Sequence, residues 1–446
     1  MRYLPLLLLI SPVLLAQPRG DLLLKNAQLV DPQAQTVRAG HVLIQGDKIA
    51  QIWLSKLPKA VTATEIVDLH NHYLLPGLFD LHVHAWGDPA PTGEDEDDME
   101  MGPPMSAQHM QNVGVTGFLD LGTAPEVIFG LRERVRTRVQ PGADVFAAGP
   151  VWVQIPPEKA TEMGGFHAGA FVTGPQDVPQ KIHDFIQKWR PDVVKVIYDH
   201  SGTRPGMDIP TLVAIVQAAH KQKTKVVAHI QLWQDIRDAV GAHVDAVTHL
   251  DDDGDIPDDV TQVLAKTHTC IIPTLGVQMG LTDIVDKPEV QADPLLRALV
   301  EPKLLETYRH PEQFGRKGTF WLGWQRGSRA SYLRSLRRLY DAGICTLPGA
   351  DTGNIGVFQG WSLHRELELY GEAGVPAWKV LRSATVEAAQ FVGSDAGRLQ
   401  AGARANLLVV KDNPVKHLAA TRTVDLVVQG GRIVKNHVEA RAPPPR

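Results

Sequence analysis

Two His-x-His pairs lie close together near the start of the chain, and each could present two imidazoles to one metal ion. His70 and His72 flank an asparagine in DLHNHY, whereas His82 and His84 flank a valine in FDLHVH. Side chains two residues apart on a strand point to the same side, and neutral imidazole is a common metal ligand. The first question is therefore which pair could bind metal.

The sequence around the two pairs distinguishes them. The run FDLHVH predicts a strand, so His82 and His84 are expected to share one face at its end. The first pair lies between two short apolar runs, where Asn71 tolerates the left-handed conformation that a hairpin needs. We therefore expect His70 and His72 to lie in a solvated turn.

Lys195 is the strongest single anomaly in the chain. Its neighbours in VVKVI are branched and apolar, and lysine is almost never fully buried without a partner. Reaction of the neutral amine with carbon dioxide would give an anionic carbamate, which can bridge two divalent ions. A lysine paired with Asp199 or another carboxylate is the alternative that Lys195 alone leaves open.

Short apolar runs alternate with helix-like segments between residues 78 and 392. The eight runs expected to be strands are GLFDLHVH, GVTGFLDLG, DVFAAGP, DVVKVIYD, KVVAHI, DAVTHL, HTCIIPTLG and GICTLPGAD. Eight such units predict an α/β fold, a (β/α)8 TIM barrel over residues 78–393, with its active site at the carboxyl ends of the strands. Residues 278–341 are expected to form helical insertions over one end of the barrel.

The two ends of the chain have a different pattern of apolar and polar residues. Short alternating runs separated by polar turns predict a small β-sandwich domain formed from both termini, residues 17–77 and 394–446. Residues 1–16 place one arginine ahead of an apolar run and predict a signal peptide. We expect an exported protein, periplasmic or secreted, with no stable membrane association after signal removal.

Composition narrows the classes of partner. The chain has 446 residues, 43% of them hydrophobic, and a formal net charge of -5, so it carries no basic footprint for nucleic acid. A small molecule or short peptide is the expected partner, and a homo-oligomer stays open. Cys270 and Cys345 lie in short apolar runs and are expected to be buried free thiols, although export would permit a disulfide.

Polar residues end or interrupt the predicted strands one, four, five, six and eight. They are His82, His84, Lys195, His229, His249 and Asp351. This ordered set resembles the amidohydrolase superfamily, in the branch with two metal ions and a carboxylated lysine. PGLFDLHVH is similar to its opening signature, and ATVEAAQFVGSDAGRLQAGARANLLVVKDNP to its passage into the small domain. The resemblance covers residues 21–438 and is strongest to dipeptidases and N-acyl amino acid hydrolases, including prolidase-like members.

The resemblance implies a role for each of these residues. His82, His84 and Asp351 would hold the more buried ion, and His229 and His249 the more exposed one. N6-carboxylysine at Lys195 would bridge them, and His and carboxylate ligands suit two zinc ions. A hydroxide shared by the ions would cleave a C–N amide bond, with Asp351 as the catalytic proton carrier.

Three alternatives remain beside amide hydrolysis. Mononuclear deaminases of the superfamily lack the bridging lysine and place a glutamate where this chain has Gln231. The same ligand set could act on a cyclic amide, a lactone or a phosphotriester. A non-catalytic exported binding barrel is the third alternative.

Four further residues are expected to contact substrate. His167 follows Gly164, Gly165 and Phe166, where relatives often carry a Gly-Gly-His loop. Tyr198, His200 and Arg204 follow the predicted bridging lysine. Strict alternation points Tyr198 away from Lys195, but a turn near residues 201–202 could redirect these side chains, and Arg204 could hold a substrate carboxylate.

Two acidic runs fall in loops on the predicted catalytic face. One spans residues 94–98, and the other comprises residues 251–253 with Asp255, Asp258 and Asp259. We expect an electronegative barrel mouth that favours basic or neutral substrates over acidic ones.

Overall fold

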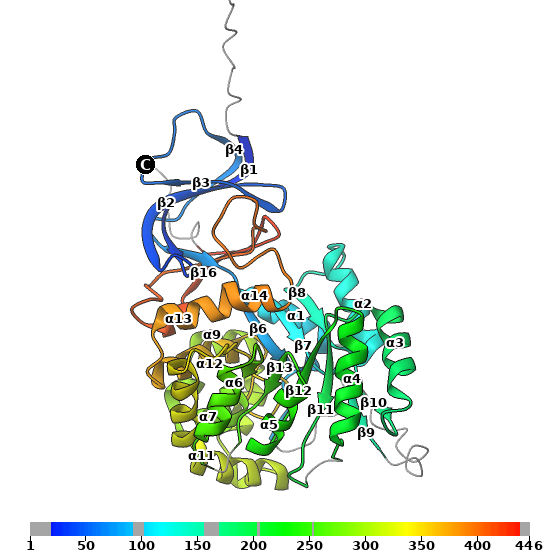
Figure 1. Cartoon of the computed structure of the whole chain (residues 1–446). Coiled ribbons are helices and arrows are strands. Elements are labelled where there is room, and N and C mark those ends of the chain that lie inside the picture. The colour runs from blue at the N-terminus through cyan, green and yellow to red at the C-terminus, as the bar shows by residue number, and fades with distance from the viewer. Residues whose placement is uncertain (1–18, 92–101, 156–168, 203–205, 252–253, 438–446) are drawn as a thin grey trace, which may run out of the picture.

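The computed structural model of the chain describes residues 19–91, 102–155, 169–202, 206–251 and 254–437. Within these ranges, parallel strands enclose the centre of the larger part of the molecule (Figure 1). They are β6 (Leu78–Val83), β7 (Val115–Asp120), β8 (Asp144–Ala147), β9 (Val151–Gln154), β11 (Val193–Ile197), β12 (Lys225–His229), β13 (Ala246–Thr248) and β14 (Cys270–Ile272). The predicted barrel is confirmed.

The third barrel strand is divided. Gly149 has a φ of 73° and precedes Pro150, so the chain bends between β8 and β9. Consequently β8 pairs with β7, whereas β9 pairs with β11. A further strand that the sequence did not predict, β10 (Gly169–Val172), pairs with β9.

The eighth strand is the weakest part of the ladder. It joins its neighbours through isolated bridges, Ile271 to Thr346 and Val83 to Thr352. Pro348 lies between these bridges and has no N–H to donate, but its carbonyl accepts a hydrogen bond from the N–H of Leu81. These contacts close the barrel between β14 and β6.

The barrel strands are buried on both faces, as their continuous apolar sequences require. Leu81, Val193, Val227 and Ile272 share one inner cluster. Alternating residues such as Val194 pack outward against the helices. The helices are α1 (Gly102–Asn112), α2 (Pro125–Arg136), α3 (Val178–Trp189), α4 (Ile209–Lys221), α5 (Trp233–Gly241), α6 (Asp258–Ala265), α12 (Trp361–Glu372), α13 (Ala377–Arg382), the π-helix η3 (Ser383–Glu387) and α14 (Ala388–Phe391).

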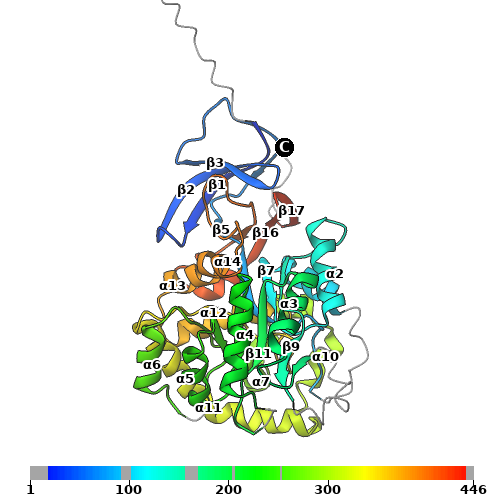
Figure 2. The same ribbon diagram turned by 45° about the vertical axis from the view of Figure 1, so that its right-hand side comes forward.

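The predicted insertion before the eighth strand is helical. It comprises α7 (Leu275–Asp286), α8 (Pro288–Gln291), α9 (Pro294–Leu299), α10 (Pro302–Thr307), η2 (Pro311–Gln313) and α11 (Arg316–Asp341). Figure 2 shows α11 lying across the end of the barrel remote from the small domain. Buried Asp283 on α7 joins the insertion to the barrel helices, because it accepts hydrogen bonds from Arg329 on α11 and Arg365 on α12.

The small domain combines both ends of the described chain. Its sheet has the order β17-β16-β15-β5-β1-β2-β3, with β4 paired to β1. These strands are β1 (Arg19–Asp31), β2 (Thr36–Gln45), β3 (Lys48–Leu54), β4 (Thr62–Asp68), β5 (Tyr73–Pro76), β15 (Leu407–Val410), β16 (Val424–Gln429) and β17 (Arg432–Asn436). The short 3-10 helix η4 (Leu418–Arg422) precedes β16. Antiparallel pairing of Leu75 with Leu408 joins the two halves.

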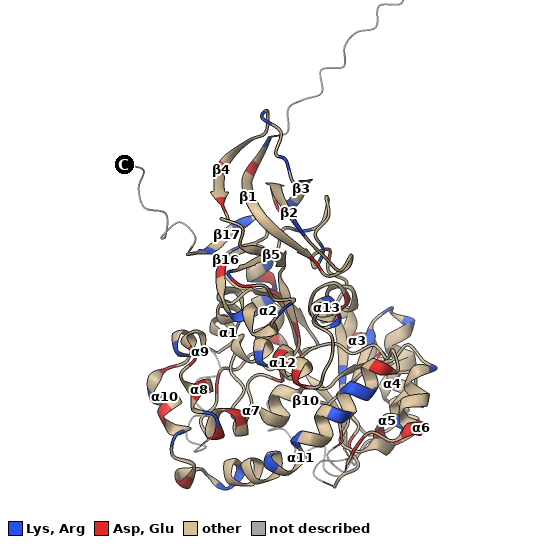
Figure 3. Cartoon of the chain, turned by 90° about the vertical axis from the view of Figure 1, so that its left-hand side faces the viewer, with Lys and Arg blue, Asp and Glu red and all other residues tan. Residues whose placement is uncertain are grey.

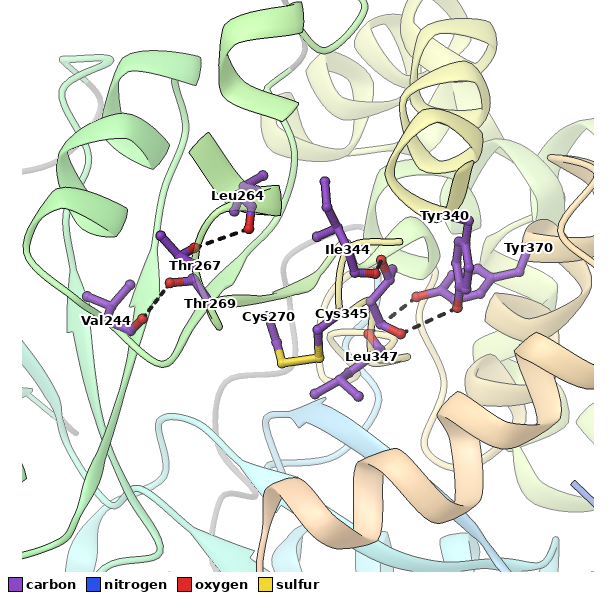
Figure 4. The surroundings of a disulfide bond; sticks show 11 residues. Val244, Leu264, Thr267, Thr269, Cys270, Tyr340, Ile344, Cys345, Leu347 and Tyr370 are labelled. Atoms are coloured by element: carbon purple, nitrogen blue, oxygen red, sulfur yellow. Dashed lines mark hydrogen bonds between the residues drawn. A yellow bond between two sulfur atoms is a disulfide. The ribbon is translucent and has the colours of Figure 1, made fainter. Parts of the chain in front are cut away.

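The two cysteines form a disulfide, so the expectation of free thiols is wrong. Cys270 begins β14 and Cys345 lies on the eighth strand, with Cα atoms 4.6 Å apart and a sequence separation of 75. Figure 4 shows this bond beside Tyr340 and Tyr370, whose hydroxyls donate to carbonyls of the eighth strand. Local sequence could not reveal the pairing because it depends on closure of the barrel across the insertion.

No helix in the described ranges is long and apolar enough to span a bilayer.

Candidate metal centre

A β-bulge in β6 aims the second His-x-His pair. Asp80 pairs with Phe118 but Val83 pairs with Asp120, so β6 has one extra residue over this stretch. Leu81 consequently packs in the inner cluster and Val83 in the outer one. Simple alternation correctly placed the two histidines on one face, but it could not predict the bulge that turns this face inward. Bulges commonly re-aim side chains beside active sites.

His82 and His84 converge on Asp351 at the carboxyl end of the eighth strand. Nε2 of His82 lies 3.3 Å, and Nε2 of His84 3.2 Å, from Oδ1 of Asp351. The ligand atoms of these three residues lie within 4.8 Å of one another. Two tetrahedral ligands at 2.0–2.1 Å from one zinc ion would be about 3.3 Å apart. These residues therefore fit a single divalent ion.

The remaining predicted ligands adjoin this group. The His249 ring centroid lies 5.1 Å from that of His82 and 4.5 Å from that of His229. Lys195 is 2% exposed, and its Nζ donates to Oγ1 of Thr248, the residue before His249. The fold thus brings the residues of strands one, four, five, six and eight together.

Left-handed backbone conformations mark the ends of three strands around the centre. His249, Thr274 and Asp351 have φ values of 78°, 53° and 60°. Such conformations cost about 1–3 kcal/mol each for residues other than glycine and cluster at functional sites. Thr274 also places its Oγ1 2.7 Å from Nδ1 of His249. Thr274 could not be selected from the sequence, since a threonine after a proline gives no signal for this role.

Electrostatics favours the protonation states that metal binding requires. Burial, followed by the charges of Lys195 and His249, holds the pKa of His82 well below its usual value. Burial raises the pKa of Asp351, but the hydrogen bond and charge of His84, with the charges of His249 and Lys195, outweigh it and lower the pKa overall. A neutral imidazole and an ionised carboxylate are the forms that coordinate metal.

Asp80 supports the two strands that carry these ligands. It is fully buried, and its Oδ1 accepts hydrogen bonds from the backbone N–H of His82 and of Ala350, at 3.2 and 3.0 Å. Burial raises its pKa to about 7. Asp80 therefore joins strand one to strand eight directly beneath His82 and Asp351.

Other side chains fix His84. The indole of Trp86 stacks on its ring with centroids 4.4 Å apart, and Trp86 Nε1 donates to the carbonyl of Gly353. Nε2 of Gln359 donates to the carbonyl of His84 at 2.9 Å. Orientation of metal-binding histidines by such outer partners is general in metalloproteins.

Unlike the predicted metal ligands, the described residues predicted to contact substrate do not converge on the candidate centre. Tyr198 is buried in the outer cluster, and its hydroxyl donates to Asp238 on α5. His200 Nδ1 lies 2.8 Å from Asp235 on the same helix. Both side chains are thus engaged by α5, and their placement adds no support to a role in substrate binding. His167 and Arg204 lie outside the described residues.

Asp199 is a further residue beside the candidate metal centre, whereas its place in the sequence suggested only a partner for Lys195. It is 1% exposed, and its Oδ2 lies 3.9 Å from Nε2 of His229. Its even spacing from Lys195 along one strand was the available signal.

The first His-x-His pair lies in the small domain, where His70 and Asn71 form a left-handed turn with φ values of 49° and 65°. His70 is exposed, as predicted for a solvated turn. The His72 side chain is 23% exposed, and its Nδ1 lies 2.7 Å from Oδ2 of buried Asp425. This distance corrects the expectation that both histidines are solvated.

The described residues of the second acidic run are paired rather than free. Asp255 and Asp259 accept hydrogen bonds from Arg334 and Arg237, and Asp258 binds Arg338. Figure 3 shows blue basic positions along α11. These arginines offset the charges of Asp255, Asp258 and Asp259, whereas Asp251 accepts a hydrogen bond from the backbone N–H of Trp233. Residues 94–98 and 252–253 lie outside the described ranges, so the electronegative mouth stays a prediction.

The fold and the site together are those of a metal-binding barrel: a parallel barrel that carries a group of two histidines and an aspartate at the carboxyl ends of its strands. The chain belongs to the amidohydrolase family, whose model matches residues 73–434. This range contains every predicted ligand, and the prediction of an amidohydrolase is confirmed at the level of the family.

Solved structures share the fold over nearly the whole chain. A Xaa-Pro dipeptidase with bound methionine has a TM-score of 0.73 at 20% identity, over 93% of this chain and 100% of that one. A putative prolidase from Bifidobacterium longum has a TM-score of 0.71 at 22% identity, over 94% and 98% of the two chains. An ochratoxinase from A. niger has a TM-score of 0.69 at 17% identity, over 94% and 96%.

Sequence relatives match only locally. A dihydroorotase of Ehrlichia chaffeensis is 38% identical over 61 residues, 13% of this chain and 14% of that protein. An adenine deaminase of Desulfatibacillum aliphaticivorans is 38% identical over 80 residues, 17% of this chain and 13% of that protein. The matched stretches thus span about a seventh of these curated relatives.

Proposed function

We propose that this chain is a metal-dependent hydrolase that adds water across a C–N amide bond of a dipeptide or an N-acyl amino acid. The observation that carries the proposal is the convergence of His82 and His84 on one oxygen of Asp351, at the 3.2–3.3 Å separation expected of ligands to one ion. Lys195, His229 and His249 lie against this group and would complete a centre for two ions.

Each residue has a part in the proposed reaction. His82, His84 and Asp351 would hold one zinc ion and His229 with His249 a second, bridged by Lys195 as its N6-carboxylated form. Bound ions would supply a Lewis acid and an activated water. Asp351 would accept a proton on its carboxylate and deliver it to the leaving nitrogen. The fixed positions of Asp80 and Trp86 would keep His82 and His84 oriented.

The choice of substrate class rests on the fold relatives and on the predicted bridge. The Xaa-Pro dipeptidase and the putative prolidase align with more than 90% of this chain. Lys195 is present on the fourth strand, and Gln231 stands where the deaminase pattern requires a glutamate. These residues favour hydrolysis of an amide over deamination.

The proposal is tested with the full chain, lacking residues 1–16, after reconstitution with zinc. We expect it to bind close to two ions per chain and to release free amino acids from members of a panel of dipeptides and N-acyl amino acids. Cyclic amides, lactones and phosphotriesters form the comparison panel. Faster turnover of a compound from this comparison panel would show that the proposed substrate class is wrong. A chain that binds no metal would contradict the hydrolase proposal and favour a non-catalytic binding protein.

We also propose that the protein is exported. The disulfide between Cys270 and Cys345 supports this proposal, because such bonds persist mainly in oxidising compartments. Expression of the whole chain in a bacterial host, followed by fractionation, should place the processed protein outside the cytoplasm. Retention of an unprocessed chain in the cytoplasm would contradict it.

A further inference from the structure

Asn354 clamps the candidate metal-binding carboxylate. Its Nδ2 donates two hydrogen bonds to Asp351, one to the backbone carbonyl and one to Oδ1, both at 3.0 Å. The amide carries two hydrogens and can supply both bonds. Because Asp351 has a φ of 60°, the clamp holds its backbone and its side chain together in a left-handed conformation that aspartate rarely adopts.

The clamp distinguishes the two oxygens of Asp351. Oδ1, which Asn354 binds, is also the oxygen nearest to Nε2 of His82 and of His84. Oδ2 lies instead 3.9 Å from Nδ1 of His249. The amide therefore fixes which oxygen faces the histidine pair and stops the carboxylate from rotating about its last bond.

The loop that carries Asn354 is anchored on both sides. The carbonyl of Asn354 accepts a hydrogen bond from the N–H of Val357. Thr352 donates from Oγ1 to Gln359, which in turn donates to the carbonyl of His84. A Cβ on Gly353, whose φ is 89°, would lie 2.5 Å from the same carbonyl. These contacts tie the loop to the end of β6.

We propose that Asn354 is a positioning residue of the metal centre, which presents Oδ1 of Asp351 to the ion shared with His82 and His84. This inference rests on the proposed function. An alanine would remove both hydrogen bonds from Asn354 to Asp351 and leave only the histidine contacts to orient the carboxylate. Outer partners of this kind contribute about 10- to 100-fold to metal affinity.

The test is titration of the metal-free full chain with cobalt(II), followed by its visible absorption spectrum. For Asn354→Ala we expect cobalt to bind about 10- to 100-fold more weakly, with a shifted spectrum because the ligand geometry has changed. The thermal unfolding midpoint of each metal-free variant establishes that it is folded.

Asn413→Asp provides a control. Asn413 lies in the small domain and accepts a hydrogen bond from the N–H of Val415 through Oδ1, a role that an aspartate keeps. This variant should bind cobalt with the affinity and spectrum of the parent chain. A parent chain that binds no cobalt would overturn the proposed function itself. A parent that binds cobalt, with an unchanged affinity and spectrum in folded Asn354→Ala, would overturn only the role of Asn354.

Discussion

Nζ of Lys195 donates to Oγ1 of Thr248 at 2.9 Å, which places the amine beside the strand that leads into His249. The lysine is 2% exposed, and its charge contributes to the lowered pKa of His82. A cation here is unfavourable for nearby metal ions. Conversion to a carbamate would replace this repulsion by coordination.

Replacement of Lys195 by alanine should remove most metal from one or both sites and most of the activity. A small carboxylate such as propionate should restore part of both, because it can occupy the space of the missing bridge. Metal content by mass spectrometry and turnover in the presence of propionate are the measurements. Lys225→Ala, at the start of β12 and the opposite end of the barrel, is the control and should retain its metal. Full activity with bound metal in Lys195→Ala would exclude a bridging role.

The two His-x-His pairs should respond differently to the same change. His82→Ala and His84→Ala are each expected to lose the more buried ion, since the candidate site would keep only two of three ligands. His70→Ala and His72→Ala should bind metal like the parent chain, because these residues lie in a turn of the small domain. Atomic absorption of the dialysed proteins measures the difference. Equal metal loss in both sets would contradict the assignment.

Asp80→Ala should weaken both stability and metal binding. The change removes the acceptor for two buried N–H groups, those of His82 and Ala350, and each unsatisfied group costs about 1–3 kcal/mol. Asp80→Asn keeps an acceptor oxygen and should behave close to the parent. Denaturant unfolding of the metal-free proteins, followed by zinc titration, separates the two effects. Equal behaviour of the alanine and asparagine variants would rule out the backbone hydrogen bonds as the cause.

Glu366 should make stability depend on pH. Burial raises the pKa of this carboxyl from 4.5 to about 8, despite the backbone hydrogen bonds from Gly276 and Leu275. Between these values the folded chain keeps a proton that the unfolded chain has lost, so this contribution to stability decreases as pH rises, by up to about 1.4 kcal/mol per pH unit. The stabilising contribution of protonated Glu366 is complete below pH 4.5 and lost above pH 8.

Glu366→Gln mimics the protonated form and should flatten the decrease in unfolding free energy between pH 5 and pH 8. Guanidinium unfolding at several pH values measures the slope. Glu289→Gln, at an exposed position on α8, is the control and should keep the slope of the parent. A parent slope that persists in Glu366→Gln would assign the effect to another group.

Removal of the disulfide should destabilise the chain without affecting metal binding. Cys270→Ala with Cys345→Ala frees the weakly paired eighth strand and is expected to cost about 2–4 kcal/mol. The bond lies at the amino ends of its strands, opposite the metal centre, so zinc affinity should stay unchanged. Thermal unfolding with and without dithiothreitol measures the effect, and the reductant should not alter the double variant. An equal midpoint for parent and double variant would show that the barrel closes without the bond.

Local sequence patterns were sufficient to predict the barrel, its helical insertion and most of the candidate metal ligands. Continuous apolar runs indicate strands buried on two faces, and a lysine or histidine within such a run is costly unless it has a partner. For this reason Lys195, His229 and His249 could be selected from the sequence. The barrel, the helical insertion and the turn at Asn71 follow from periodicity and turn chemistry in the same way.

Contacts across the fold required the three-dimensional structure. The disulfide depends on the meeting of two strands separated by a long insertion, and the bulge in β6 depends on register with β7. Asn354 acts only because Asp351 adopts a left-handed conformation at the end of the eighth strand. Tyr198 faces α5 because the strand keeps its alternation to the end. The free energies of these contacts depend on the distance and direction between atoms that are far apart in sequence. Residue order alone does not specify these distances and directions.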